Sequence, residues 1–588
     1  MRLFGRVALI VLAVVGSLTL LLAVAIGLWT ARQEAPPLPA HMVLSLDLNH
    51  GLAETRPDSP LARLQNDDAP TVLEVVRALD RAADDPRVGG LLARLDGARI
   101  GMAQAQELRA AVARFRASGK RTLFYSSGLG EGSAATIGYY LASAFQQVWL
   151  QPSGDLGITG FMAESPFLKG LFDKLGITAQ FGARWEYKSA IEIFTRDGMS
   201  KANQDSLSRL VRGWTGQIVA AVAHDRGLTP DQVRQDIDQA PLMADEALKD
   251  KLVDKLAYWD EVQKSLLPLG QKFVAVDDYA ARLKDEPNAV KVALIMGVGT
   301  VQRDGGEALS DGPVFSARRL VKAFEDAAKD PKVKAILFRI DSPGGSYPAA
   351  DAVWRAVGQA RAAGKPVVVS MGDVAASGGY FAALPADRIF ADPGTITGSI
   401  GVFSGKFVAA DLWKKVGVSW GEVPGGANAG MWSSNQTFSP AAWARLNVML
   451  DHVYADFTGK AEQARHIAPT AMDALARGRI WTGADAAQRH LVDGVGGYDA
   501  AWAAIRDLVH VPSQMPLALE PFPRPRDPME ELLDILRTGH VPDDMAASLA
   551  AGSRTAVLLE RLQRLTAPLT ALMADPAPQT RMPPLAVH

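Results

Sequence analysis

The chain has 588 residues, of which 48% are apolar and 21% are charged, and it contains no cysteine. This length exceeds what a single hydrophobic core supports, so we expect at least two large units. The 62 basic and 64 acidic residues nearly cancel, which argues against a dedicated nucleic-acid binder. The lack of cysteine excludes disulfides, thiolate metal sites and a cysteine nucleophile.

The first thirty residues have the composition of a membrane anchor. Arg2 and Arg6 precede an uncharged, mostly apolar run over residues 7–30. At 1.5 Å per residue such a run can cross a hydrocarbon layer of about 30 Å. The basic end is expected to stay in the cytoplasm, so everything after Arg32 should lie on the other side of the membrane. The alternative is a signal peptide that is cleaved near Ala25.

Internal similarity divides the rest of the chain into two copies of one unit. The stretch around Asp85 matches the stretch around Asp330, a separation of 245 residues, and Gly138 matches Gly379 at a separation of 241 residues. A register that persists over about 200 residues indicates a duplication. We refer to the two copies as the first and the second repeat.

Both repeats alternate apolar runs with amphipathic segments. Strands are predicted over 42–48, 90–95 and 122–126 in the first repeat, and over 290–298, 335–340 and 366–371 in the second. Helices are predicted around residues 72–79 and 320–324, where apolar residues follow a helical period. This alternation predicts parallel sheets with crossover helices. In such sheets, active sites lie beyond the carboxyl ends of the strands.

The second repeat carries a glycine pair at the end of one predicted strand. Residues 341–346 read Asp-Ser-Pro-Gly-Gly-Ser, whereas the matching first-repeat stretch 96–100 has no glycine pair. Because glycine has no Cβ and tolerates positive φ, the backbone N–H groups of Gly344 and Gly345 could approach a ligand closely. The functional interpretation is an oxyanion donor, and the alternative is an ordinary tight turn.

The next strand of the second repeat leads into a run of small residues that contains a serine. Ser377 stands directly before Gly378 and Gly379, and the first repeat has Thr136 at the matching position. A serine between a strand and a helix, among small residues, is typical of an exposed nucleophile. Taken alone, such a serine is more often an N-cap or a packing serine than a nucleophile, but the glycine pair one strand earlier reverses this preference.

A serine nucleophile needs a base that takes its proton. None of the nine histidines lies in these loops, although a distant histidine could fold back. Lys188 is the other candidate, because it lies among aromatic and apolar residues and burial would lower its pKa. Its matching residue in the second repeat is Ala429, so the two repeats would be complementary. The alternative is an ordinary surface lysine.

Four motifs together resemble one enzyme family. They are DSPGG at 341–345, ASGGYFAA at 376–383, ADPGTITGSIGVF at 391–403 and EYKSAIEIFT at 186–195. The combination resembles signal peptide peptidase A, also called protease IV, in its long, duplicated, membrane-anchored bacterial form (peptidase family S49). The resemblance implies an α/β fold with tandem ClpP/crotonase-like domains behind an N-terminal transmembrane helix. It also implies a serine/lysine-dyad endopeptidase.

Functional residues are carried over from the family by matching motifs. Ser377 would be the nucleophile and Lys188 the general base, and Ser399 would help to orient the lysine amine. The oxyanion donors would be the backbone amides of Gly344, Gly345 and Gly378. The resemblance implies no cofactor and no metal, and it implies signal peptides and other extended apolar peptides as substrates. It also implies a homo-oligomer, a tetramer by resemblance, whose catalytic region lies on the periplasmic side of the bacterial inner membrane.

Six units are predicted along the chain. They are a cytoplasmic N-terminus (1–6), a transmembrane anchor (7–30), a proline-rich linker (31–40), a repeat that supplies the lysine (41–270), a repeat that supplies the serine (271–510) and an extension (511–588). The extension is expected to be partly ordered, with regulatory docking as the alternative. Two other functions stay open: an acyl-CoA enzyme of the crotonase type, and a catalytically idle membrane scaffold that binds peptides.

Overall fold

The computed structural model describes residues 37–56, 69–131, 133–270, 272–283, 286–304, 313–524, 579–581 and 586–587. The predicted anchor over 7–30 lies outside these residues. Within the described part of the chain, every helix is too short or too polar to cross a bilayer.

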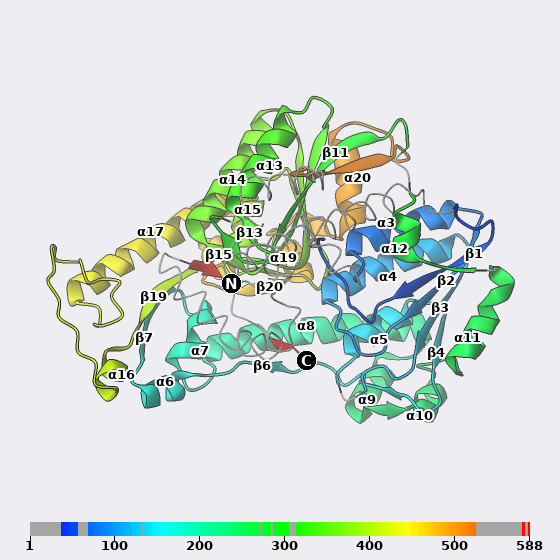
Figure 1. Ribbon diagram of the computed structural model, residues 1–588, viewed down its shortest axis with the longest axis horizontal. Coiled ribbons are helices and arrows are strands. Elements are labelled where there is room, and N and C mark those ends of the chain that lie inside the picture. Colours follow the sequence, from blue (N-terminus) through cyan, green and yellow to red (C-terminus); the bar gives the residue numbers. More distant parts are fainter. Residues whose placement is uncertain are drawn as a thin grey trace, which may run out of the picture.

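The first repeat forms a six-stranded sheet in which all neighbouring strands are parallel. In sheet order its strands are β10 (Lys272–Ala275), β1 (Met42–Asp47), β2 (Val88–Arg94), β3 (Arg121–Ser126), β4 (Gln147–Leu150) and β9 (Lys255–Leu256). The helices that follow β1, β2 and β3 are α3 (Val72–Asp84), α4 (Met102–Ala117) and α5 (Thr136–Ser143). This sheet lies at the right of Figure 1.

Helix α3 shows why the sequence pattern predicts these elements. Thr71 caps its first turn by accepting a hydrogen bond from the Glu74 N–H, and the Glu74 side chain accepts one from the Thr71 N–H. Such a capping box satisfies backbone donors that a helix start leaves free. The predicted apolar face, which includes Val72 and Leu79, is fully buried. The helical prediction for this segment is therefore confirmed.

The second repeat forms an eight-stranded sheet. Six strands follow one another in the order β20 (Ile480–Thr482), β18 (Ile396–Gly398), β16 (Val367–Ala376), β14 (Ala335–Ser342), β11 (Val290–Val298) and β22 (Leu517–Phe522). The remaining two are β17 (Arg388–Ala391), which pairs with β16, and β21 (Gly494–Val495), which pairs with β17. All pairs are parallel except that of β18 with β20. The class predicted from the sequence, α/β with two parallel sheets, is confirmed.

Both sheets extend beyond the boundaries predicted from the sequence. Strand β10 follows residue 270, yet it pairs with β1 of the first repeat. Strand β22 follows residue 510, yet it pairs with β11 of the second repeat. In each repeat the last strand is added in parallel beside the first strand, so the predicted boundaries at 270 and 510 each fall just before the strand that completes the sheet.

A strand pair joins the two repeats at the left of Figure 1. Strand β7 (Thr178–Arg184) from the first repeat lies antiparallel to β19 (Val402–Val408) from the second, with Arg184 opposite Val402. Helix α17 (Pro440–Arg465) packs against both strands. Because the chain leaves β7 beside the second repeat, the residues that follow it reach the end of the second sheet.

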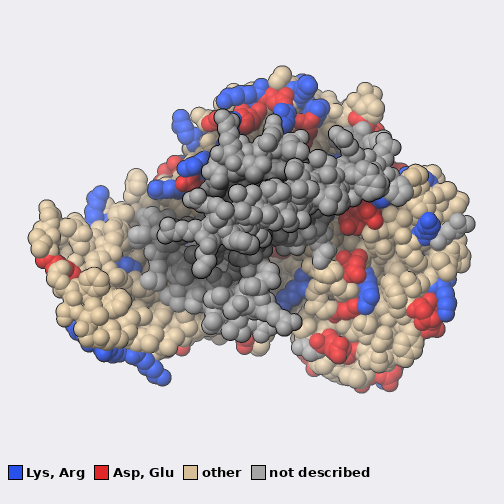
Figure 2. Space-filling model, viewed as in Figure 1, with Lys and Arg blue, Asp and Glu red and all other residues tan. Residues whose placement is uncertain are grey.

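The two repeats also share buried contacts nearer the centre. One hydrophobic cluster includes Leu91 from β2 and Leu337 from β14. Beside it, the fully buried Arg339 donates hydrogen bonds to Glu54 and Glu107 of the first repeat. Charged side chains of both signs are interspersed over the upper and right-hand parts of the surface in Figure 2.

Candidate active site

Ser377 lies between strand β16 and helix α15 (Gly378–Ala383). Its backbone has φ 56° and ψ −114°, a conformation that is uncommon for a residue with a side chain. The N–H of Ser377 donates to the Gly398 carbonyl at 2.8 Å, and its own carbonyl accepts from the Phe381 N–H at 2.8 Å. These two bonds hold the backbone of Ser377 on both sides. The residue is also completely buried.

Lys188 follows β7 and directly precedes a short 3₁₀ turn. The second repeat holds this segment in place, because the Tyr187 N–H donates to the Arg477 carbonyl at 3.1 Å. The Lys188 side chain is only 2% exposed. A lysine of the first repeat is thus enclosed by residues of the second.

The structure brings three of the sequence-predicted residues together. The Nζ atom of Lys188 lies 2.7 Å from Ser377 Oγ, 3.0 Å from Ser399 Oγ and 2.9 Å from the Ser399 carbonyl oxygen. Ser399 is completely buried and has φ 52°. The amine therefore has three oxygen neighbours, and two of them belong to Ser399.

Burial lowers the pKa of Lys188 well below its ordinary value. The cause is desolvation, since the charged form of the amine loses its water shell in the protein interior. The three oxygens around Nζ belong to hydroxyl and carbonyl groups, and these lack the full charge that would hold an ammonium ion in place. A neutral amine at hydrogen-bond distance from a serine hydroxyl can accept the hydroxyl proton.

The three glycines predicted as oxyanion donors belong to β15 (Gly344–Ser346) and to helix α15, which pack against each other, and they have different settings. Gly344 has φ 93°, and its N–H donates to Ser342 Oγ at 3.2 Å. A Cβ on Gly345 would lie 2.3 Å from the Val301 carbonyl oxygen, so only glycine fits there. Gly378 is the first residue of α15, where helical N–H groups have no acceptor within the helix.

The matching positions of the other repeat lack this arrangement. Thr136, the counterpart of Ser377, begins α5, and its hydroxyl exchanges hydrogen bonds with Gly160 at 3.0 and 2.9 Å. Ala429, the counterpart of Lys188, lies in an exposed segment. Among the described residues, Lys188 and Ser377 therefore form a buried serine–lysine pair, whereas the matching residues Ala429 and Thr136 do not.

The histidine alternative fails for the described part of the chain. The seven histidines there are all exposed to solvent, whereas Ser377 is completely buried. These histidines are His41, His50, His224, His452, His466, His490 and His510. The predicted alternative of a surface lysine at position 188 is likewise wrong, because that side chain is buried.

Several neighbours of the site escaped the sequence analysis. Gly478 has φ 87° and donates its N–H to the Ile400 carbonyl at 2.7 Å. Arg479 accepts at its carbonyl from the Ser399 N–H, also at 2.7 Å. These residues hold Ser399 through backbone contacts alone, so no side-chain pattern could reveal them. The Ser342 contact with Gly344 had a signal, because Ser342 stands within the DSPGG motif.

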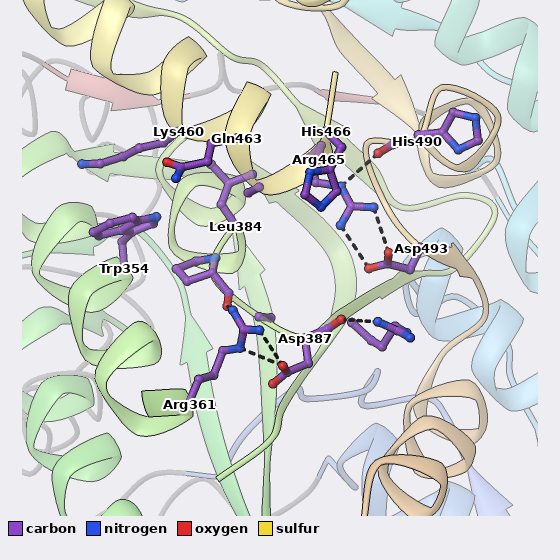
Figure 3. Close-up of a pocket in the computed structure, with 14 residues that line it drawn as sticks. Trp354, Arg361, Leu384, Asp387, Lys460, Gln463, Arg465, His466, His490 and Asp493 are labelled. Atoms are coloured by element: carbon purple, nitrogen blue, oxygen red, sulfur yellow. Dashed lines mark hydrogen bonds and ion pairs between the residues drawn. The ribbon is translucent and has the colours of Figure 1, made fainter. Parts of the chain in front are cut away.

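One cavity lies away from these residues. It measures about 750 Å³ and lies beside the end of α17, where Arg465 pairs with Asp493 and Arg361 pairs with Asp387 (Figure 3). Its main charges thus satisfy one another. A second cavity of about 670 Å³ is lined by Lys188 and by residues on both sides of it in the sequence.

Comparison with known proteins assigns the family. The model of peptidase family S49 matches residues 116–270 and again residues 359–512, one match in each repeat. Protease 4 of Salmonella typhi is 32% identical over 74% of this chain and 72% of its own. Protease 4 of Haemophilus influenzae is 30% identical over 84% of this chain and 83% of its own. The chloroplastic serine protease SPPA of Arabidopsis thaliana is 30% identical over 77% of this chain and 68% of its own.

These matches define the chain as a serine peptidase in which the unit that the family model describes occurs twice. It belongs to peptidase family S49. Among solved structures, a ClpP1 mutant from Listeria monocytogenes matches 37% of this chain and 94% of its own at 13% identity, with a TM-score of 0.24, too low to carry a conclusion. Family membership decides in favour of a peptidase and against the acyl-CoA enzyme and the idle scaffold.

Proposed function

We propose that the protein is a membrane-anchored endopeptidase that uses Ser377 as nucleophile and Lys188 as general base. The observation that carries this proposal is the 2.7 Å distance between Lys188 Nζ and Ser377 Oγ in a fully buried setting. The lowered pKa of Lys188 supports it, because only the neutral amine can accept a proton.

The proposed reaction proceeds through an acyl-enzyme. Lys188 takes the hydroxyl proton as Ser377 Oγ forms a bond to the carbonyl carbon of the scissile peptide. Backbone N–H groups from among Gly344, Gly345 and Gly378 stabilise the negative charge that develops on the carbonyl oxygen. The lysine then gives its proton to the leaving amine as the C–N bond breaks. Water attacks the resulting ester, Lys188 takes the water proton, and Ser377 Oγ leaves with that proton.

Three single substitutions test these roles. Ser377→Ala and Lys188→Met should each reduce kcat for a peptide substrate by at least about a thousandfold, because nucleophile and base act as a unit. Thr136→Ala is the matched control, since Thr136 occupies the serine position of the first repeat, and it should leave turnover almost unchanged. Near-normal hydrolysis by either of the first two variants would overturn the assignment.

The proposed substrates are cleaved signal peptides and other extended apolar peptides. Support comes from the family resemblance and from β15 (Gly344–Ser346) and β19, whose facing edges pair with an antiparallel strand and so suit an extended peptide. Hydrolysis of a signal-peptide sequence should exceed that of a polar peptide of equal length by at least tenfold in kcat/KM. Equal rates for the two peptides would remove the preference.

The proposed location is the bacterial inner membrane, with the catalytic region on the periplasmic side. Support comes from the apolar run over 7–30 and from the basic residues before it. The full chain should stay with membranes during alkaline extraction, and a chain without residues 1–36 should be released. Release of both forms would contradict the anchor. An intact mass that fits a chain beginning directly after Ala25 would show that a signal peptide is cleaved.

We also propose that the protein forms a homo-oligomer. The residues that match β7 in the second repeat, 419–425, pair with no strand of the described chain. The exposed fractions of Trp420 and Val423 there are 56% and 100%. A second copy could cover this segment as β19 covers β7, and such head-to-tail contacts form a ring when the rotation between successive copies closes. Light scattering should give a multiple of the chain mass, and the double variant Trp420→Glu, Val423→Asp should give the monomer mass.

A further inference from the structure

A strand from the end of the sequence lies between two strands that border the candidate site. Strand β23 (Gln579–Arg581) is antiparallel both to β15 (Gly344–Ser346) and to β19. These strands belong to a third sheet, which also contains β7. Without β23 this sheet would fall into two separate pieces, one with β15 and the other with β19 and β7. Figure 1 shows β23 as a red arrow beside β15.

Strand β23 fills the slot between β15 and β19, and residues of the candidate active site border this slot. On one side, Gly344 lies opposite Arg581 and Gly345 lies opposite Thr580. On the other side, β19 begins three residues after Ser399 and pairs with β23 at Phe403. Helix α15, which begins directly after Ser377, packs against β15. A strand in this slot therefore lies along the predicted oxyanion glycines.

An extended substrate would need the same slot. Peptides bind to exposed sheet edges by adding a strand, and backbone hydrogen bonds then provide much of the affinity. The edges of β15 and β19 that face each other can hold only one strand between them, and β23 pairs with both. Binding of a substrate strand and binding of β23 are thus mutually exclusive.

We propose that Gln579–Arg581 is an internal pseudosubstrate that competes with peptide substrates for the slot between β15 and β19. This inference rests on the proposed peptidase site. It assigns to the predicted extension a regulatory contact with the catalytic cleft of its own chain.

The sequence around β23 favours a competitor over a substrate. Prolines stand at positions 576, 578, 583 and 584, on both sides of the strand. Proline has no N–H and a fixed φ, so it cannot continue the ladder of hydrogen bonds. The strand is therefore confined to a few residues, and the flanking peptide bonds are poorly suited to extended binding and cleavage.

A second contact holds the same segment to the first repeat. Strand β24 (Ala586–Val587) pairs antiparallel with β6 (Ala163–Glu164). Two attachments within one chain raise the effective concentration of the segment at the slot. A short strand that would bind weakly as a free peptide can then compete with substrate.

The full-length variant Thr580→Pro tests the proposal. Proline opposite Gly345 should break the strand pairing, so KM for an apolar fluorogenic peptide should fall at least fivefold while kcat stays within twofold. Thr580→Val is the matched control, because valine keeps the N–H and favours strands, and it should leave KM unchanged. A chain that ends at residue 574 should behave like Thr580→Pro, and a synthetic peptide of residues 575–588 should inhibit it competitively.

Two results would overturn the proposal. One is an unchanged KM in both Thr580→Pro and the shortened chain. The other is loss of residues 575–588 from the active enzyme but not from Ser377→Ala, measured by intact mass, because the segment would then be a substrate. Binding of a labelled peptide to Ser377→Ala, with and without Thr580→Pro, repeats the comparison without turnover. Absence of any peptide hydrolysis would contradict the proposed function, whereas this binding comparison would still decide on the pseudosubstrate.

Discussion

The backbone of Lys188 lies so close to Gly478 that a Cβ on this glycine would be 2.3 Å from the Lys188 nitrogen. Gly478 belongs to the second repeat and Lys188 to the first, so this contact fixes the depth to which the lysine enters the site. A real Cβ cannot approach a backbone nitrogen so closely, and any side chain at position 478 must push the Lys188 segment away.

We therefore expect Gly478→Ala to impair catalysis by displacing the amine from Ser377. A misplacement of about 1 Å can reduce kcat by up to about a hundredfold. Gly417→Ala is the matched control, because Gly417 has a similar φ of 78° but no atom within 4 Å of a Cβ. Steady-state kinetics of both variants give the comparison. Equal activity of the two variants would show that the contact does not position Lys188.

Ser399 provides a second test of positioning. Ser399→Gly removes the hydroxyl 3.0 Å from Lys188 Nζ and tolerates the φ of 52°. Loss of this single hydrogen bond should reduce kcat about five- to tenfold, and it should shift the pH at which activity appears. His466→Gly, which replaces another residue of positive φ at the end of α17, should change neither quantity. An unchanged pH profile in Ser399→Gly would mean that this hydroxyl does not orient the amine.

Activity should depend on the protonation of Lys188. Burial lowers its pKa, so the neutral, active amine should predominate at a lower pH than for an exposed lysine. We expect kcat/KM to rise tenfold per pH unit on the acidic side and to level off above the pKa of Lys188. Thr136→Ala is the control and should give the same dependence of kcat/KM on pH as the native chain. A rise centred near the ordinary lysine value of 10.5 would show that the amine is hydrated in solution.

Folding stability should depend on a second titratable group, which is partly buried at the contact between the repeats. Asp373 accepts hydrogen bonds from the Ala103 and Gln104 N–H groups at 2.7 and 3.4 Å. Burial, reinforced by the charge of Glu54, raises the pKa of Asp373 to about 6. The stability contributed by its protonated form is complete below the ordinary pKa of 3.8 and is lost as pH rises through about 6.

Asp373→Asn should remove part of this loss. The free energy of unfolding of the variant, minus that of the native chain, should be larger at pH 8 than at pH 5 by on the order of 1–3 kcal/mol. Urea unfolding at the two pH values measures the difference. Asp238→Asn, an exposed position on α9 (Pro230–Gln239), should leave the pH dependence unchanged. A pH dependence of Asp373→Asn equal to that of the native chain would exclude Asp373 as its source.

Much of the fold could be predicted from local patterns. The helical period placed the buried face of α3, and the apolar runs at 335–340 and 366–371 became β14 and β16. These elements depend on neighbouring residues in the chain, so their signals are local. The ends of the two repeats were missed because β10 and β22 gain their place only by pairing with strands that are distant in the sequence.

By itself, the sequence determined the duplication, the alternation of strands and helices, and the types of residue that a serine peptidase needs. Only the tertiary structure decided that Lys188 lies 2.7 Å from Ser377 and that Gln579–Arg581 lies along the glycines of β15. Both contacts join segments about 190 or more residues apart through the pairing of β7 with β19 and of β23 with its neighbours. Backbone pairing of this kind is largely independent of side-chain identity, so no local pattern in the sequence records it.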